Sequence, residues 1–215
     1  MDPSVETRSF DVQSVLGFPG RFSTYPQHSV SPDGKYLLGI ASGDSRREIV
    51  ALPLEERGEA VTIASLPGGG QNLKATMTLG WTLSGDAVYL LEGVQPWGPH
   101  EGSEGIAIYC QKPGGSPEEV GFVPPRVFRG RCWFVPKDHA AFLQVSGALW
   151  KVDLLLGGAE EVISDLPSYD GLLNPVLSPD GAYFAYRLHE PGRSGILVLD
   201  TRTKKETLLL PDGGR

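Results

Sequence analysis

Apolar residues along this chain are grouped in short alternating stretches, which indicates β-strands rather than helices. The clearest stretches cover residues 35–41, 87–91, 140–145 and 182–188, and turn-forming residues separate them. Alternation with a period of two over four to eight residues is typical of strands, whereas no stretch shows the 3.6-residue period of an amphipathic helix. The pattern therefore predicts an all-β protein.

The same tight turn precedes two of these strands. Residues 31–34 read Ser-Pro-Asp-Gly, and residues 178–181 repeat that sequence. Proline fits the second corner of a type I turn, aspartate tolerates the third, and glycine supplies the backbone freedom that follows. Weaker copies lie at residues 84–86 and 136–138. A turn and strand that recur along a chain indicate a repeat architecture.

The aspartates of the four copies divide the chain into units. Asp33, Asp86, Asp138 and Asp180 fall at intervals of 53, 52 and 42 residues, and in three copies an aromatic residue follows three positions later. The units cover approximately residues 27–70, 74–124, 125–167 and 168–214, with residues 1–26 as an N-terminal segment that either adds a closing strand or wraps the domain.

Each unit has room for four short strands, which is the size of a β-propeller blade. The alternative is a two-sheet sandwich, which accounts for short strands but not for a turn that recurs at the same place in each unit. The predicted strands are residues 35–41, 48–54, 60–66, 76–83, 87–91, 105–111, 118–123, 127–135, 140–145, 149–155, 161–163, 172–177, 182–188, 195–200 and 206–210.

Residues 31–38 and 178–185 resemble the repeat of TolB-type β-propellers, as does the strand that ends in a short acidic turn at residues 196–203. Similar blades form the N-terminal propeller of prolyl oligopeptidase-family serine peptidases. The resemblance covers residues 27–214 and implies a fold rather than an activity. Those propellers usually have more than four blades. Four units therefore imply either a small closed ring or part of a larger ring, completed by a second copy or another domain.

Charge and cysteine content narrow the range of functions. A formal net charge of −7 argues against broad nucleic-acid binding, and the absence of a long apolar run argues against a membrane span. Cys110 and Cys132 lack metal-ligand spacing and are interpreted as small buried thiols, with a disulfide as the alternative. No signal peptide is visible, which favours a cytoplasmic location unless a leader has been removed.

Candidate binding residues come from the loops that join the second and third strands of each unit. In a propeller these loops lie on the same side as the connections between blades, and ligands commonly bind there. The residues expected to bind are Trp97, His100, Glu101, His189, Glu190 and Arg193, accompanied by Arg46, Arg47, Gln71, Lys74, Tyr169 and Asp170. The alternatives are that Trp97 packs onto its own blade and that the histidines are solvated loop residues.

No cofactor, metal ion or catalytic residue is predicted. The sequence contains no Gly-x-Ser-x-Gly nucleophile elbow, and Ser194 in residues 192–195 comes nearest to one with the wrong spacing. We therefore expect a non-catalytic propeller module that presents a loop face to a protein or peptide. The alternative is the substrate-gating propeller of a prolyl oligopeptidase-like hydrolase whose catalytic domain lies elsewhere. A homodimer or a further domain that completes the ring is also expected as a partner.

Overall fold

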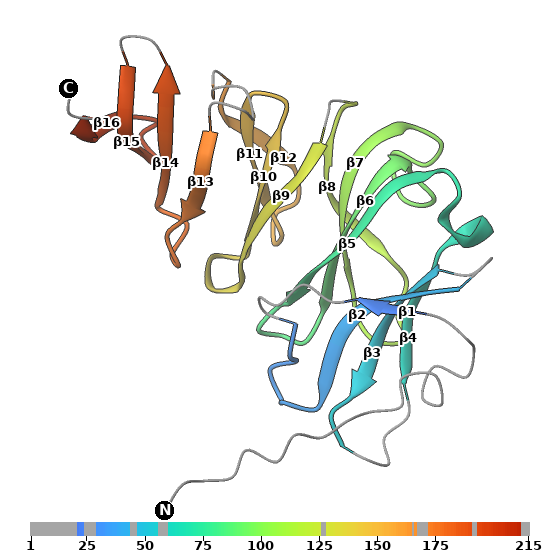
Figure 1. The fold of residues 1–215 in the computed structure, drawn as a ribbon. Helices are drawn as coiled ribbons and strands as arrows, with labels where there is room; N and C mark the ends of the chain where they lie inside the picture. The colour runs from blue at the N-terminus through green and yellow to red at the C-terminus, as the bar shows by residue number, and fades with distance from the viewer. Residues whose placement is uncertain are drawn as a thin grey trace, which may run out of the picture.

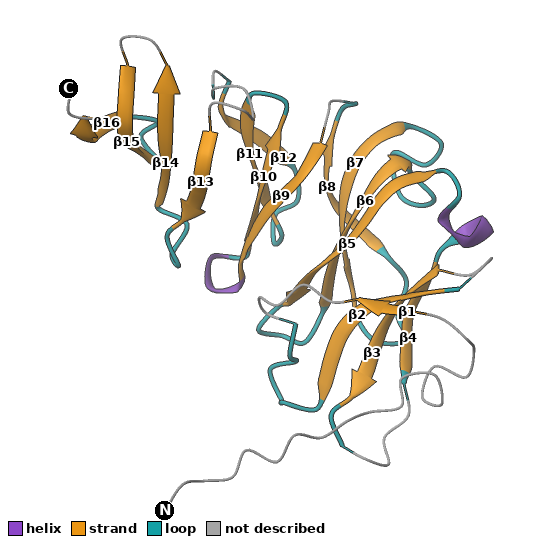
Figure 2. Ribbon diagram, viewed as in Figure 1, coloured by secondary structure: helices purple, strands orange, loops and turns teal. Residues whose placement is uncertain are grey.

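The chain is built almost entirely from short strands. A computed structural model describes residues 21–23, 29–43, 47–55, 60–125, 128–164, 166, 172–190 and 193–211. No helix in these ranges is long and apolar enough to cross a membrane. The elements are β1 (Arg21–Ser23), β2 (Tyr36–Ser42), β3 (Arg47–Pro53), β4 (Val61–Ser65), η1 (Pro67–Gly70), β5 (Leu73–Trp81), β6 (Ala87–Val94), β7 (Glu104–Gln111), β8 (Glu118–Val123), β9 (Phe128–Val135), η2 (Pro136–Asp138), β10 (Ala140–Val145), β11 (Ala148–Asp153), β12 (Ala159–Ile163), β13 (Leu172–Leu177), β14 (Tyr183–Glu190), β15 (Arg193–Asp200) and β16 (Glu206–Pro211) (Figure 2).

The strands form four separate antiparallel sheets in sequence order, which we call blade 1 (β1–β4), blade 2 (β5–β8), blade 3 (β9–β12) and blade 4 (β13–β16). The predicted four four-stranded propeller blades are therefore confirmed, and the sandwich alternative is wrong. The innermost strand of blade 1, β1, lies inside the segment 1–26. In Figure 1 the blades follow one another along an open arc, with blades 1 and 4 at its two ends.

The Ser-Pro-Asp-Gly turns are held by their own side chains. The Ser31 hydroxyl donates to the Asp33 carboxylate at 2.6 Å and accepts the backbone N–H of Tyr36 at 2.9 Å. Ser178 makes the equivalent bonds with Asp180 and Tyr183 at 2.6 and 2.9 Å. These bonds fix the turn and hold the first residue of the following strand opposite the serine that opens the turn.

The two weaker copies reach the same result with different residues. In blade 2, Thr82 takes the place of the serine and accepts the N–H of Asp86 at 2.9 Å, so the turn is one residue shorter than in blade 1. The aspartate that sequence spacing aligned with Asp33 is thus shifted to the start of the strand. In blade 3 the turn is η2, and His139 adopts a positive φ of 47° at its end.

The hydrophobic core lies between consecutive blades. One cluster joins blades 1 and 2, a second joins blades 2 and 3, and a third joins blades 3 and 4. We call the side of a blade that meets the next blade its forward face, and the opposite side its rear face. Because side chains alternate along a strand, the two faces of blade 3 are both apolar, with Phe142 directed to blade 4 and Leu143 to blade 2.

Buried polar side chains join blades 1 and 2 in addition to this packing. The Trp81 indole N–H donates to the Ser29 carbonyl at 2.9 Å. The Gln111 carboxamide donates to the carbonyls of Ile63 and Gly115, and it accepts the Tyr89 hydroxyl at 2.7 Å. Every partner must be present, because a buried polar atom without a hydrogen bond is costly.

We predict that Tyr89→Phe lowers the free energy of unfolding by about 1–3 kcal/mol, because it leaves the Gln111 carbonyl oxygen buried without its donor. Denaturant unfolding followed by tryptophan fluorescence measures this change. Tyr183→Phe is the control, since half of that side chain is exposed, and it should leave stability nearly unchanged. Equal stability of the two variants would contradict the role assigned to Gln111.

The turn aspartates make stability depend on pH. Hydrogen bonds from Ser31 and the Lys35 N–H hold the pKa of Asp33 below 3.8, and Ser178 and the Ala182 N–H do the same for Asp180. The unfolded chain therefore binds more protons, so this stabilisation is complete above about pH 4 and is lost as the pH falls through the lower folded-state pKa values.

We predict that the double variant Asp33→Asn/Asp180→Asn loses stability less steeply than the wild type between about pH 5 and pH 3. Denaturant midpoints measured across this range test the prediction. The double variant Glu55→Gln/Glu101→Gln removes the same formal charge outside the turns and should keep the wild-type slope. Identical slopes for all three proteins would refute the contribution of the turns.

Candidate functional site

A hollow on the side of the loops lies on blade 2. We call this side the loop rim: it is where the second strand of each blade ends and the third begins. A hollow of about 420 Å³ is lined there by Lys74, Glu92, Gly93, Glu104, Gly105, Ile106 and Pro125. These residues come from the start of β5, the end of β6, the start of β7 and the connection after β8, which antiparallel pairing places at one edge.

Charged residues at the hollow are arranged around one lysine. The Lys74 ammonium group pairs with the Glu104 carboxylate, and both side chains are at least half exposed. The hydrogen bond that Lys74 donates to Glu104 and the charge of Glu104 raise the pKa of Lys74, and the charge of Glu92 adds to this effect. Two carboxylates around one cation leave the hollow with a net negative charge. Lys74 is among the candidate residues named from the sequence, whereas Glu92 and Glu104 fall just outside the predicted strands 87–91 and 105–111.

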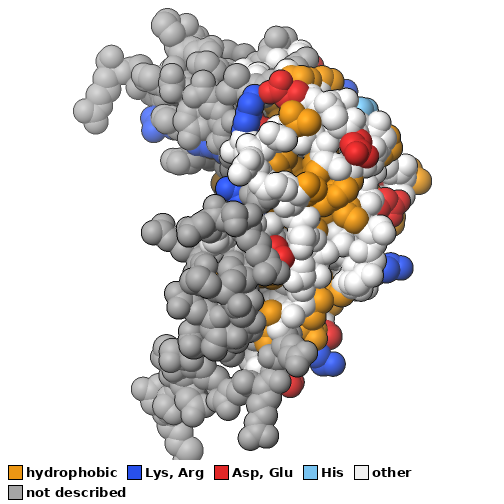
Figure 3. All heavy atoms as spheres, turned by 90° about the vertical axis from the view of Figure 1, so that its right-hand side faces the viewer, with side chains coloured by type: hydrophobic (Ala, Val, Ile, Leu, Met, Phe, Trp, Pro, Cys, Tyr) orange, Lys and Arg blue, Asp and Glu red, His pale blue; other side chains and the backbone are white. Residues whose placement is uncertain are grey.

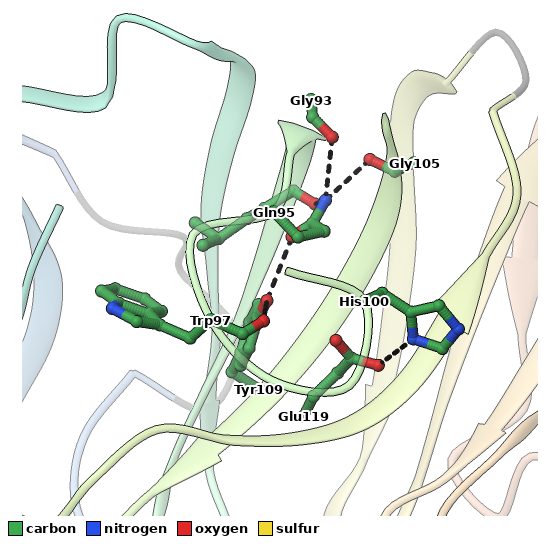
Figure 4. Close-up of polar contacts among 8 residues, drawn as sticks. Gly93, Gln95, Trp97, His100, Gly105, Tyr109 and Glu119 are labelled. Atoms are coloured by element: carbon green, nitrogen blue, oxygen red, sulfur yellow. Dashed lines mark hydrogen bonds and ion pairs between the residues drawn. The ribbon is translucent and has the colours of Figure 1, made fainter. Parts of the chain in front are cut away.

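The long loop beside the hollow has a fixed backbone. Gln95 is 1% exposed, and its amide donates to the carbonyls of Leu91, Gly93 and Gly105 at 3.2, 3.1 and 2.9 Å. Its carbonyl oxygen accepts the hydroxyl of Tyr109 at 3.2 Å (Figure 4). The buried Gln95 side chain therefore holds both ends of the loop 95–103 to the sheet. No sequence motif indicated this role.

Trp97 packs onto its own blade, which is the alternative to an exposed binding residue. Its ring makes an edge-to-face contact with Tyr109 at a centroid distance of 5.8 Å, and its carbonyl accepts the Tyr109 hydroxyl at 3.0 Å. The indole also packs against the cluster between blades 1 and 2. Trp97 thus joins the loop to the core. Its side chain is only partly buried.

His100 is bound to its own blade by two contacts. Its Nδ1 lies 2.5 Å from the carboxylate of Glu119 on β8, and its ring stacks on Phe122 at a centroid distance of 3.9 Å. The Glu119 side chain is only 4% exposed, whereas that of His100 is 43% exposed. Glu101, the next residue, is exposed at the tip of the loop. His100 is therefore packed against β8, whereas its neighbour Glu101 is exposed to solvent.

The other predicted site residues are not brought to this hollow. His189, Glu190 and Arg193 belong to the β14–β15 hairpin of blade 4, and blade 3 separates them from His100 (Figure 1). Arg47 begins β3 and Gln71 follows η1, both at the loop rim of blade 1. Arg46, Tyr169 and Asp170 lie outside the described residues. The described histidines, cysteines and carboxylates contain no group of three arranged to hold a metal ion.

The two cysteines are free thiols, so the disulfide alternative is wrong. Both pack against the cluster between blades 2 and 3. Burial raises the pKa of Cys110 and of Cys132 to about 12. Each is therefore protonated at neutral pH, as expected of small core residues rather than nucleophiles.

Similarity to known proteins is found in structure. No protein-family model matches the chain, and no curated protein sequence does. The chain is similar to TolB from Acinetobacter baumannii, with 21% identity, a TM-score of 0.52, and coverage of 86% of this chain and 43% of that one. A TolB-designated protein from Agrobacterium tumefaciens aligns with 17% identity, a TM-score of 0.46, and coverage of 90% and 63%. The GH74 enzyme of Niastella koreensis aligns with 13% identity, a TM-score of 0.45, and coverage of 86% and 30%.

The likeness to the Acinetobacter protein confirms the TolB-type resemblance at the level of the fold. The chain spans less than half the length of that protein. The resemblance to prolyl oligopeptidase-family propellers remains a prediction.

We predict that His100→Ala lowers the free energy of unfolding by about 1–3 kcal/mol, because it leaves the nearly buried Glu119 carboxylate without its partner. Glu119→Gln is the matched change, and the double variant His100→Ala/Glu119→Gln should be more stable than His100→Ala alone. A double-mutant cycle of denaturant midpoints measures this coupling. Additive effects would mean that the two side chains do not stabilise each other.

Proposed function

We propose that this chain is a non-catalytic β-propeller module whose loop rim binds a protein or peptide. The observation that carries the proposal is the hollow on blade 2, next to a loop that a buried glutamine holds in place. Binding surfaces that are already ordered lose less conformational entropy when a partner arrives. A rigid rim with an adjoining hollow is therefore suited to recognition.

The charge at the rim favours a basic partner segment. Glu92 and Glu104 flank Lys74 at the hollow, exposed Glu101 lies on the neighbouring loop, and the chain carries a net charge of −7. Figure 3 shows the side of the molecule that carries blades 1 and 2, where hydrophobic side chains gather among scattered charged groups. Such a surface offers apolar contact area together with carboxylates that attract lysine or arginine side chains.

The architecture supports binding by a scaffold. The four blades are packed against one another through continuous apolar clusters, so the loops project from a rigid support. The two thiols are partly buried, and their raised pKa values make them poor nucleophiles at neutral pH. Loops held on such a support can recognise a partner without any chemical step.

Selection of peptides from a displayed random library on the purified chain tests the proposal. We expect the enriched peptides to contain lysine or arginine, and Glu104→Lys to weaken their binding about fivefold at low salt because it removes an exposed charge contact. Fluorescence polarisation of labelled peptides gives the dissociation constants. Leu155→Ser, on the opposite side of blade 3, is the control and should bind normally. If no peptide is enriched, or if both variants bind equally, the loop rim is not the binding surface.

A further inference from the structure

The forward face of blade 4 is apolar and exposed. Val176, Ala185 and Val198 lie side by side across β13, β14 and β15, because the register pairs Val176 with Ala185 and Ala185 with Val198. Tyr183 and Ile196 extend the same side of the sheet. The exposed fractions of Val176, Tyr183 and Ile196 are 57%, 50% and 37%. We call these five residues the forward patch.

Equivalent positions in the other blades show that such a face is normally covered. Ile49, Ile108, Leu149 and Ile196 lie on the forward face of the third strand of their blades. Ile49, Leu149 and Ile196 come four residues before the position that pairs with the start of the second strand, and Ile108 comes three residues before it. Ile49, Ile108 and Leu149 are 0% exposed, because the next blade packs on them, whereas Ile196 is 37% exposed. The forward patch is thus a blade interface that has no covering blade among the described residues.

A second copy cannot cover the patch in the head-to-tail manner of consecutive blades. That arrangement needs the rear face of blade 1, where Ala41, Val50 and Leu52 form a cluster with Phe22 and Ala60. Ala41, Val50 and Leu52 are 0%, 2% and 8% exposed, so this face is already buried. The exposed apolar sheet face that remains in the described chain is the forward patch itself.

The forward patch is complementary to itself. Arg187 and Asp200 lie on the same side of the sheet, near opposite ends of the patch, since Tyr183 pairs with Asp200 and Arg187 pairs with Ile196. A two-fold axis that runs across the strands exchanges these ends, so the arginine of one copy approaches the aspartate of the other. Small side chains at the centre, Ala185 and Val198, allow two flat sheets to approach closely.

We propose that two copies of this chain associate through the forward faces of blade 4, related by a two-fold axis. The contact is isologous, so each copy contributes the same five apolar residues and the same two charges. It removes the exposed forward patch from water, which is the main force that favours association. This dimer is independent of the loop rim, so the failure of either proposal leaves the other standing.

Sedimentation velocity of the full 215-residue chain over about 1–100 µM tests the dimer. We expect a concentration-dependent equilibrium between monomer and dimer. Ile196→Glu should raise the dissociation constant at least about tenfold, because it buries an unpaired charge in the contact. Val176→Lys, at a more exposed position, serves as a second variant in case the first one fails to fold. Leu156→Glu, at the 89% exposed hairpin of blade 3, should leave the dimer unchanged.

Cross-linking locates the contact. Val198→Cys lies at the centre of the patch, so mild oxidation should join two copies through this residue, whereas Leu155→Cys should not. The native thiols, protonated by burial, are poor competitors in this reaction. A monomer at every concentration would overturn the proposal. So would a dimer that neither patch variant weakens, or the absence of a cross-link at residue 198.

Discussion

The structure depends on the packing of one blade's forward face against the rear face of the next. A four-stranded sheet has two faces, and each interior sheet here is apolar on both of them. Such a sheet cannot be stable alone in water, because burial of each large apolar side chain contributes roughly 1.5–3 kcal/mol that an isolated blade forfeits. The blades are therefore interdependent, and the end blades are the places where this requirement must be met in another way.

The two end blades, blade 1 and blade 4, differ in how far their apolar outer faces are kept from water. At blade 1 the rear-face residues Ala41, Val50 and Leu52 are buried and form a small cluster with Phe22 from β1. The ring of Phe22 lies so close to Gly39 that a side chain at that position would collide with it. At blade 4 the forward face keeps half-exposed valine, isoleucine and tyrosine side chains. The apolar face at one end is therefore buried, and the apolar face at the other end is exposed.

The predicted site residues also divide into side chains that pack against the blade and side chains that are exposed on its surface. Trp97 and His100 looked like exposed loop residues in the sequence, yet each is held to blade 2 by an aromatic contact. The charged groups around them are more exposed, at Glu101 and at the hollow with Lys74 and Glu104. Aromatic side chains on this loop therefore fix its shape, and the carboxylates determine what it attracts.

The sequence by itself determined the class of fold, because strand alternation and the repeated Ser-Pro-Asp-Gly turn are local signals. Those signals located most strands and the TolB-type repeat, since a turn of this kind fixes the register of the strands that it joins. The turns of blades 2 and 3 were harder, because Thr82 and His139 perform the same task without the motif.

Only the tertiary structure decided which side chains meet. Glu119 lies 19 residues beyond His100, and Gln111 reaches a carbonyl 48 residues away, so no local pattern reveals either contact. The one-residue difference in turn length also decides that Tyr89 faces backward into the core while Tyr183 faces forward into solvent. Side chains alternate between the two faces of a strand, so a shift of one residue moves a side chain to the opposite face. Tyr183 is exposed because the forward face of blade 4 has no covering blade among the described residues.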